Sequence, residues 1–412
     1  MKNDTKKENK LENAAIPLTE PGDMDSFDMV VIGGGPAGSM AALTAADLRL
    51  SVLMVERDHI IGSPVRCAEG VDKKGISQFF TPDPKWIAAE ITGYYLVAPD
   101  GTRVKMDIGL EHGYILERML FDRMIAEKAA NHGAAVMTGV DAVAMSELSD
   151  GFRTVHMKGT DSEWDVKARV VVAADGVESR AARWAGLKTS VTPYDMETCA
   201  QATCAAIDID HHAFYMYFTG EFAPGGYVWV FPKGPHTANI GLGISGTYAK
   251  KKLPTEYLDD FLTNYFPGAS VVSRTVGGIA CTGGIKKMVA DALMVCGDAA
   301  HMANPITGGG IINAMISGQF AGETAADALK KGRNDERSLA VYQKRCDSRF
   351  GKMNRWFYRV KEGILNIPND RLNEIAHEIS ALPLEKRTPV RVLRSALIKN
   401  PKLLTVLAKL VF

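Results

Sequence analysis

Residues 28–42, DMVVIGGGPAGSMAA, predict a buried strand, a glycine turn and the start of a helix. Gly33, Gly35 and Gly38 match the spacing G-x-G-x-x-G. In this pattern the first glycine permits a sharp turn, the second lets the backbone approach a diphosphate, and the third lets the helix pack tightly on the strand. The unpaired N–H groups at a helix N-terminus carry partial positive charge, so the turn suits an anionic ligand.

The next apolar run, residues 51–55, ends at Glu56, 18 positions after Gly38. An acidic side chain at this point can accept hydrogen bonds from the ribose of an adenine dinucleotide. A tight turn without a ligand would share the glycine spacing, but the second strand and its acidic end favour dinucleotide binding. Because Glu56 would repel a 2′-phosphate, the pattern predicts FAD or NAD rather than NADP.

The composition limits the classes of function. A chain of 412 residues is long enough for two or three domains. Its 48 basic and 48 acidic residues balance, so nucleic acid is not expected as a partner. The six cysteines include no C-x-x-C pair, which argues against an iron–sulfur cluster or structural zinc and suits a reducing, cytoplasmic compartment. No apolar stretch reaches the ~18 residues that a membrane-spanning helix requires.

The pattern of apolar residues predicts an α/β protein with several parts. Residues 1–26 are polar, lack the apolar core of a signal peptide and predict a disordered leader. A Rossmann-like domain is predicted from the discontinuous ranges 27–90, 106–190 and 284–335. Residues 91–105 and 191–283 alternate apolar and polar side chains with many aromatics, which predicts an inserted antiparallel β-sheet that forms a substrate domain. Residues 336–412 predict a helical C-terminal region.

A second informative block is residues 296–311, CGDAAHMANPITGGGI. Asp298 closes a strand, where it can hold a polyol, and Gly308, Gly309 and Gly310 open a helix whose N–H groups can stabilise negative charge. A reduced flavin needs both features, for its ribityl hydroxyls and its anionic ring edge. An Asp-capped turn followed by a flexible glycine loop is an equally good interpretation of this block on its own.

Three motifs together resemble the flavoprotein group of para-hydroxybenzoate hydroxylase: GGGPAG at 33–38, AADGVESR at 173–180 and GDAAH with PITGGGI at 297–311. The resemblance spans residues 27 to 330 and implies one bound FAD. It assigns the diphosphate to Gly33, Gly35 and Ala37, the ribose to Glu56, the adenosine half to Arg118 and Ala142, and the ribityl and flavin to Asp298, Gly310 and Ile311.

Two further stretches, GSPVRCAEG at 62–70 and PGGYVWVFP at 224–232, resemble the geranylgeranyl reductases, including the archaeal digeranylgeranylglycerophospholipid reductases. In that family the cysteine loop borders the flavin, which here implies Cys67, Ala68 and Gly70. The P-x-x-Y-x-W-x-F-P strand borders the lipid pocket. The resemblance implies FAD-dependent hydrogenation of geranylgeranyl chains in lipid and phospholipid biosynthesis.

The predicted substrate strand and cysteine each have two interpretations. Tyr227, Trp229 and Phe231 share one strand face by the period of two, so they line either an apolar tunnel or an ordinary sheet core. Cys67 is either a small buried hydrophobe or a group that positions an alkene or takes part in proton delivery. The flanking prolines and the Cys67 loop favour the pocket. His301 is expected to be structural.

Alternative functions and partners remain open at this point. An aromatic hydroxylase or a membrane-docked electron-relay flavoprotein shares the FAD motifs. The reductant is expected to be ferredoxin or NADPH, since no second strand–GxGxxG–helix unit is present. Residues 386–412 contain seven basic and no acidic side chains, which predicts either peripheral contact with the inner face of the cell membrane or a helical cap.

Overall fold

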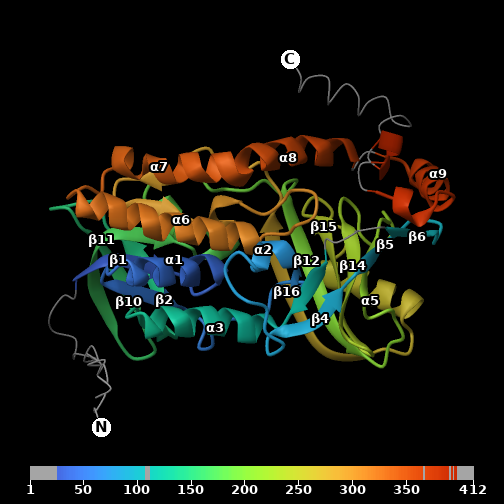
Figure 1. Ribbon diagram of the computed structural model, residues 1–412, viewed down its shortest axis with the longest axis horizontal. Coiled ribbons are helices and arrows are strands. Elements are labelled where there is room, and N and C mark those ends of the chain that lie inside the picture. The colour runs from blue at the N-terminus through green and yellow to red at the C-terminus, as the bar shows by residue number, and fades with distance from the viewer. Residues whose placement is uncertain (1–25, 107–111, 365–366, 389–390, 393, 397–412) are drawn as a thin grey trace, which may run out of the picture.

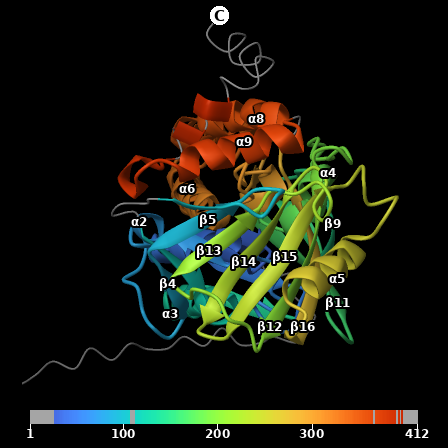
Figure 2. The ribbon, with the colours of Figure 1, turned by 90° about the vertical axis from the view of Figure 1, so that its right-hand side faces the viewer.

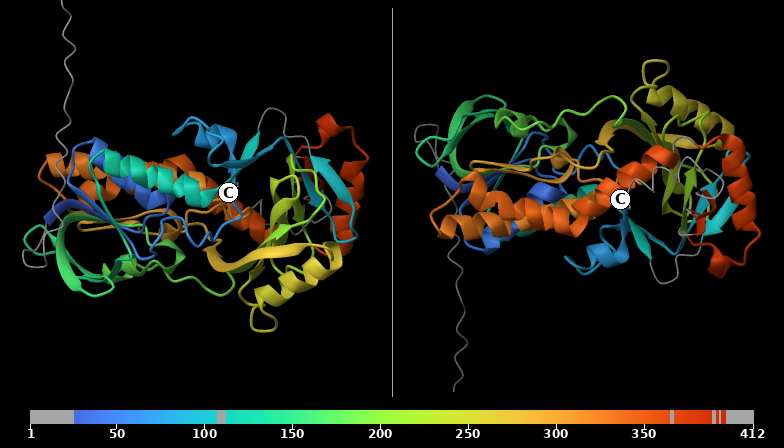
Figure 3. Two further views of the ribbon diagram at one scale, coloured as in Figure 1. Left: turned by 90° about the horizontal axis from the view of Figure 1, so that it is seen from below. Right: turned by 90° about the horizontal axis from the view of Figure 1, so that it is seen from above.

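The structure is a computed structural model that describes residues 26–106, 112–364, 367–388, 391–392 and 394–396. It combines a mainly parallel sheet with helices and a separate, mainly antiparallel sheet, and it lies elongated along one axis (Figure 1). The long stretch of α7 and α8 (Glu336–Cys346 and Lys352–Ile364) runs along one side of both sheets (Figures 1 and 3).

The nucleotide-binding sheet has the strand order β17-β18-β11-β1-β2-β8. β1 is parallel to both β11 and β2, and residues 29–32 of β1 are buried because the sheet is covered on both faces. β10 and β9 extend the sheet antiparallel from β11. The strands are β1 Ser26–Ile32, β2 Val52–Glu56, β8 Ala135–Thr138, β9 Asp141–Met145, β10 Arg153–Lys158, β11 Glu163–Ala173, β17 Val289–Ala290 and β18 Leu293–Val295.

Helix α1 (Pro36–Asp47) follows the glycine turn and lies between α3 (Arg118–Asn131) and α6 (Ile311–Lys330). A Cβ at Gly318 of α6 would overlap the carbonyl oxygen of Ala37, so the small residues of α6 allow the two helix backbones to approach closely. This packing places the first turn of α1 against the middle of α6. A Cβ at Gly297 would meet both Ala37 of α1 and Ala314 of α6, so the first turns of the two helices both approach Gly297.

The second sheet has the order β16-β12-β15-β14-β13-β5-β6 and faces the viewer in Figure 2. β13 and β5 pair in parallel, and the other neighbours pair antiparallel. The strands are β5 Gly93–Val97, β6 Arg103–Met106, β12 Met196–Ala205, β13 Ala213–Tyr217, β14 Tyr227–Gly234, β15 Thr237–Ser245 and β16 Ser270–Ala280. Strands from 91–105 and from 191–283 thus share one sheet, and helix α5 (Pro254–Tyr265), which the sequence pattern does not predict, packs on it.

Shorter elements join the two sheets. A small sheet of order β3-β7-β4 (Gly70–Asp72, Gly113–Leu116 and Ile87–Ile91) lies at their junction, where β4 and β7 contact β14. The C-terminal part continues α7 through a π-helical turn, η3 (Asp347–Gly351), into α8, and α9 (Asn369–Ser380) packs on β6. The remaining elements are α2 Lys73–Ile76, η1 Gly176–Glu178, α4 Arg180–Trp184, η2 Gly297–Ala300 and η4 Leu384–Lys386.

Candidate functional site

The glycine turn forms an open cradle at the start of α1. Gly33 has φ +106°, a left-handed conformation that favours glycine, and a Cβ at Gly38 would overlap the carbonyl oxygen of Gly33. Gly35 differs, because a Cβ there would meet no heavy atom within 4 Å. The Glu56 carboxylate accepts a 2.7 Å hydrogen bond from the Gly34 N–H at the edge of this turn. The turn is therefore tight at Gly33 and Gly38 and open at Gly35, as a bound diphosphate requires.

A cavity of about 670 Å³ extends from this cradle to the second sheet and the C-terminal helices. Nine of the predicted cofactor residues line it: Gly35, Ala37, Cys67, Ala68, Arg118, Asp298, Gly308, Gly310 and Ile311. The other six, Gly33, Gly38, Glu56, Gly70, Gly309 and Ala142, are not in its lining. Ala142 is buried in the core of the nucleotide-binding sheet, and Gly70 packs beneath the Phe231 ring. The cofactor contacts of these residues stay predictions.

The flavin end of the cavity contains both acidic and basic side chains. Burial raises the pKa of the Asp298 carboxyl, and the positive charge of Arg118 opposes this shift. Arg118 forms a 2.7 Å ion pair with Asp122, whose side chain is 2% exposed. A Cβ at Gly310 would lie 3.3 Å from Asp298 Oδ1, so glycine lets the carboxylate approach the first turn of α6. The acid and the helix N-terminus fit the ribityl chain and the anionic ring of a flavin.

A hydrogen-bonded network fixes the Cys67 loop. Glu69, 4% exposed and at φ +75°, accepts hydrogen bonds from Lys233 Nζ at 2.7 Å and Asn239 Nδ2 at 2.6 Å. Its other oxygen accepts the Arg118 N–H at 2.8 Å. The Glu69 N–H in turn points at Cys67 Sγ, 3.2 Å away. Burial raises the pKa of the Cys67 thiol, so the sulfur is protonated at neutral pH.

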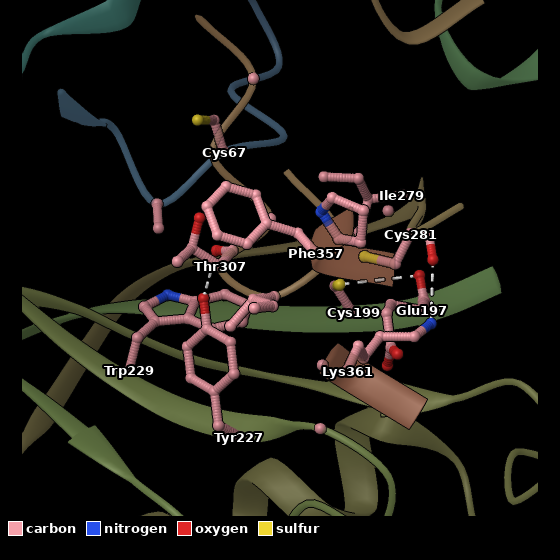
Figure 4. Close-up of a pocket in the computed structure, with 18 of the residues that line it drawn as sticks. Cys67, Glu197, Cys199, Tyr227, Trp229, Ile279, Cys281, Thr307, Phe357 and Lys361 are labelled. Atoms are coloured by element: carbon pink, nitrogen blue, oxygen red, sulfur yellow. Dashed lines mark hydrogen bonds between the residues drawn. The ribbon is translucent and has the colours of Figure 1, made fainter. Parts of the chain in front are cut away.

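The predicted substrate strand, β14, contributes two aromatic side chains to the cavity (Figure 4). The Tyr227 hydroxyl donates a 2.6 Å hydrogen bond to the carbonyl of Thr307, in the glycine loop before α6. Trp229 Nε1 donates to Gln201, whose amide donates to the Cys67 carbonyl at 3.0 Å. The strand is thereby connected to both loops at the flavin end.

Phe231 lies on the same face of β14 but does not line the cavity. Its ring packs against Phe214, with centroids 5.1 Å apart, and a Cβ at Gly70 would lie 2.7 Å from it. Alternation along β14 correctly predicts the strand face on which Phe231 lies, but the cavity does not extend to this residue. Its predicted contact with substrate stays a prediction.

Strand β12 supplies one wall of the cavity, and none of the sequence motifs indicates its residues. Glu197, Cys199 and Gln201 alternate along this strand and all three line the cavity. Opposite them on β15, Gly241 and Gly243 have no side chains. A Cβ at Gly241 would overlap the Trp229 ring, and one at Gly243 would contact Cys199 Sγ. A signal was present in the sequence, because glycines that alternate within a strand mark close approach by another group.

The far end of the cavity is apolar and belongs to elements that meet away from the glycine turn. Tyr94 and Leu96 of β5 line it together with Ile375 and Ile379 of α9, and the four side chains belong to one hydrophobic cluster. Phe357 of α8 also lines the cavity (Figure 4). Lys361 of α8 also lines the cavity, with its ammonium donating to the Cys281 carbonyl at 2.9 Å. The cavity thus joins a polar flavin end to an apolar end.

His301 has a structural environment, as expected. It is 4% exposed, and its ring nitrogens lie 3.2 Å from the Thr189 carbonyl and 3.3 Å from the Thr282 hydroxyl. Burial lowers the pKa of its imidazole. The ring therefore links three loops and is neutral at pH 7.

The glycine cradle, the Asp298 carboxyl beside a helix N-terminus and the adjoining cavity define the class as flavin-dependent oxidoreductases. A family model of the FAD binding domain matches residues 28–72, and one of the geranylgeranyl reductase catalytic domain matches residues 195–279. Relatives named digeranylgeranylglycerophospholipid reductase, from Methanosphaerula palustris and Methanococcoides burtonii, are 44% and 42% identical over 92% of this chain and over 96% and 94% of their own. The chain belongs to the digeranylgeranylglycerophospholipid reductase family, and its cofactor is FAD.

Solved structures agree with this assignment. The chain is 32% identical to a geranylgeranyl bacteriochlorophyll reductase-like protein from Thermoplasma acidophilum, with a TM-score of 0.88 over 94% of this chain and 100% of that one. p-Nitrophenol 4-monooxygenase from Pseudomonas putida, 17% identical with a TM-score of 0.70 over 92% of this chain and 99% of that one, shares the fold alone. The predicted family, fold class and cofactor are confirmed.

Proposed function

We propose that this protein hydrogenates the C=C bonds of geranylgeranyl chains on isoprenoid glycerolipids. The observation that carries the proposal is the cavity itself, because Asp298 and the glycine loop line one end and Leu96, Ile375 and Ile379 line the other. A long apolar chain can lie in the apolar end while one of its double bonds reaches the flavin end. The names of the relatives supply the same substrate class.

Different residues bind the cofactor and position the substrate. Gly35 and Ala37 would hold the FAD diphosphate and Asp298 would accept hydrogen bonds from the ribityl hydroxyls; all three line the cavity, and a Cβ at Gly35 would meet no heavy atom within 4 Å. Reduced FAD, when bound, supplies the hydride for the double bond. Hydrogen bonds to Thr307 and Gln201 fix the side chains of Tyr227 and Trp229. The two fixed rings hold the apolar chain of the substrate against the flavin end.

The test uses the purified FAD-loaded protein under anaerobic conditions. Dithionite reduces the flavin, geranylgeranyl glycerophospholipids are added, and mass spectrometry follows the lipid. We expect successive mass gains of one H2 per double bond. An unchanged lipid mass, together with NADPH-driven oxygen uptake in a separate aerobic assay, would instead favour the aromatic hydroxylase function. An unchanged mass without oxygen uptake in that aerobic assay would favour the electron-relay function.

The same assay separates the two candidate reductants. We infer that electrons come from ferredoxin or from transient contact with NADPH, since no second strand–G-x-G-x-x-G–helix unit is present in the sequence and Glu56 disfavours a 2′-phosphate in the first. Replacing dithionite by reduced ferredoxin or by NADPH, and comparing the rates of flavin reduction, identifies the donor. Flavin that neither donor reduces would contradict this inference.

We expect Cys67→Ala to retain FAD but to hydrogenate lipid about a hundredfold more slowly. The thiol lines the cavity at the flavin end, and loss of a group that positions the alkene or delivers a proton has effects of this size. Cys204→Ala is the matched control, because Cys204 is buried in the second sheet away from the cavity. Hydrogenation at the wild-type rate in Cys67→Ala would remove this side chain from the mechanism.

We also infer a peripheral membrane contact through the basic segment 386–412, most of which lies outside the described residues. Among the described residues, no helix is long and apolar enough to cross a membrane. Deletion of the segment would also remove Val392 and Ala396 from the cavity wall and could change activity for that reason. Substitutions that remove only the charges therefore test membrane contact more specifically. Changing Lys399, Lys402 and Lys409 to Gln is expected to weaken binding to anionic liposomes by on the order of a hundredfold. Unchanged co-sedimentation with the liposomes would contradict a membrane role.

A further inference from the structure

The side chain of Glu197 is a buried carboxyl in the wall of the cavity. It sits on β12 between Ser245 of β15 and Ile279 of β16, and the residue is 8% exposed. Its Oε2 is buried and has no hydrogen-bond partner among the described residues. A Cβ at Gly226, the residue before Tyr227, would lie 3.3 Å from this oxygen. The fold therefore buries a carboxyl oxygen without a hydrogen-bond partner beside β14. Such burial costs free energy, so an unpaired oxygen at this position requires an explanation such as a role in the reaction.

The charged groups around Glu197 do not neutralise it by direct pairing. Lys361 of α8 is the nearby cation, but its ammonium donates to the Cys281 carbonyl and lies 4.0 Å from Asp195. Desolvation raises the pKa of the Glu197 carboxyl to about 7; the charge of Lys361 lowers it, and that of Asp195 raises it further. Its other titratable neighbours, Tyr194, Cys199, Cys281 and Tyr227, are neutral at pH 7 because burial raises the pKa of each. The Glu197 carboxyl can therefore hold a proton near neutral pH, where an ordinary glutamate is ionised.

Cys199 and Tyr227, which also line the cavity, are poorer acids than Glu197. Burial raises the pKa of Cys199 to about 12 and raises that of Tyr227 above its ordinary value. The Tyr227 proton is also engaged, since it is donated to the Thr307 carbonyl. A general acid acts best when its pKa lies near the operating pH. Among these groups the carboxyl of Glu197 meets that condition.

The position of Glu197 also suits delivery to the second carbon of the alkene. Figure 4 shows Glu197 beside Cys199, Cys281 and Lys361, on the side of the cavity away from Cys67. Addition of H2 across a double bond places hydride on one carbon and a proton on the other. The two groups that supply them must therefore reach the alkene from different positions.

We propose that Glu197 is the general acid that protonates the alkene in this hydrogenation, an inference that rests on the proposed function. The O–H bond of the carboxyl breaks and a C–H bond forms at one alkene carbon. The π electron pair forms this bond, while the other carbon takes the hydride, with its two electrons, from the reduced flavin, which is oxidised. The Glu197 carboxylate then regains a proton from solvent. The network from Trp229 through Gln201 to Cys67 positions the chain but gives up no proton.

The test is Glu197→Gln, which keeps the shape of the side chain and removes the acid. Pre-reduced protein is mixed anaerobically with lipid in a single turnover, so flavin reduction is separated from hydrogenation. We expect hydrogenation to slow by roughly 10²–10⁴-fold, with FAD content and the rate of flavin reduction unchanged. Glu147→Gln is the matched control, because Glu147 is exposed and distant from the cavity. Hydrogenation in Glu197→Gln within about twofold of the wild-type rate would contradict the proposal.

A measurement on the unaltered protein covers the case in which the variant fails to fold. Since the protonated carboxyl is the active form, the single-turnover rate should be constant below pH ~7 and fall about tenfold per pH unit above it. A rate that stays flat through pH ~9 would contradict the proposal. Wild-type protein that hydrogenates no prenyl lipid would contradict the proposed function itself, whereas hydrogenation without this pH dependence would contradict the role of Glu197 alone.

Discussion

Gly35→Ala is expected to give a folded protein that no longer retains FAD, whereas Gly38→Ala is expected to lower the stability of the fold. Gly35 has extended backbone at φ −70° and ψ −177°, which any residue adopts, and a methyl group there would meet no protein atom within 4 Å. That methyl would project into the space reserved for the diphosphate. Loss of one or two hydrogen bonds to a charged phosphate costs roughly 2–3 kcal/mol, or about a hundredfold in affinity.

Gly38 lies in a different environment although it belongs to the same motif. Its Cβ would overlap the Gly33 carbonyl oxygen, and this backbone cannot yield without separating α1 from β1. Such overpacking costs about 1–3 kcal/mol or more against a total stability of only about 5–15 kcal/mol. The absorbance ratio of flavin to protein reports cofactor content, and circular dichroism on heating reports the fold. Stoichiometric FAD in Gly35→Ala would show that the diphosphate lies elsewhere.

Lys233→Met is expected to destabilise the protein by about 3–5 kcal/mol, because it leaves the buried carboxylate of Glu69 without its cation. The two side chains are 9% and 5% exposed, and Lys233 Nζ also donates to the Leu116 carbonyl. The free energy of unfolding comes from urea titration. Because Glu69 holds the Cys67 loop, FAD binding should weaken as well.

Two further variants make this prediction specific. Lys73→Met removes an ion pair with Glu90 in which both side chains are nearly half exposed, and it should leave stability almost unchanged. Glu69→Gln combined with Lys233→Met should recover part of the loss, since the buried charge is then gone. Equal destabilisation by Lys73→Met and Lys233→Met would mean that the buried pair has no special role.

The sequence predicts the flavin half of the site well because that half depends on local geometry. Gly33, Gly35 and Gly38 form one turn, and Asp298 follows one strand, so spacing within a few residues determines their positions. The parallel pairing of β1 with β2 and β11 then brings the motifs together at the same edge of the sheet. Fold class, cofactor and family follow from these motifs.

The substrate half depends on contacts between distant segments. Glu197 lies in the cavity because β12 pairs with β15 and β16, and Lys361 reaches it from α8 in the C-terminal region. Alternation along β14 places Phe231 on the correct face, but the cavity ends before that residue because its ring packs on Gly70. A strand pattern gives the face of a side chain and not the extent of a cavity.

The measurement that tests the proposed function most directly is anaerobic reoxidation of the flavin by lipid. Wild-type protein is reduced with one equivalent of dithionite, excess reductant is removed, and a geranylgeranyl glycerophospholipid is added while the flavin absorbance is recorded. We predict that the oxidised flavin spectrum returns without oxygen and that one double bond is reduced for each flavin reoxidised. A flavin that stays reduced until oxygen is admitted, with the lipid unchanged, would contradict hydrogenation at this site.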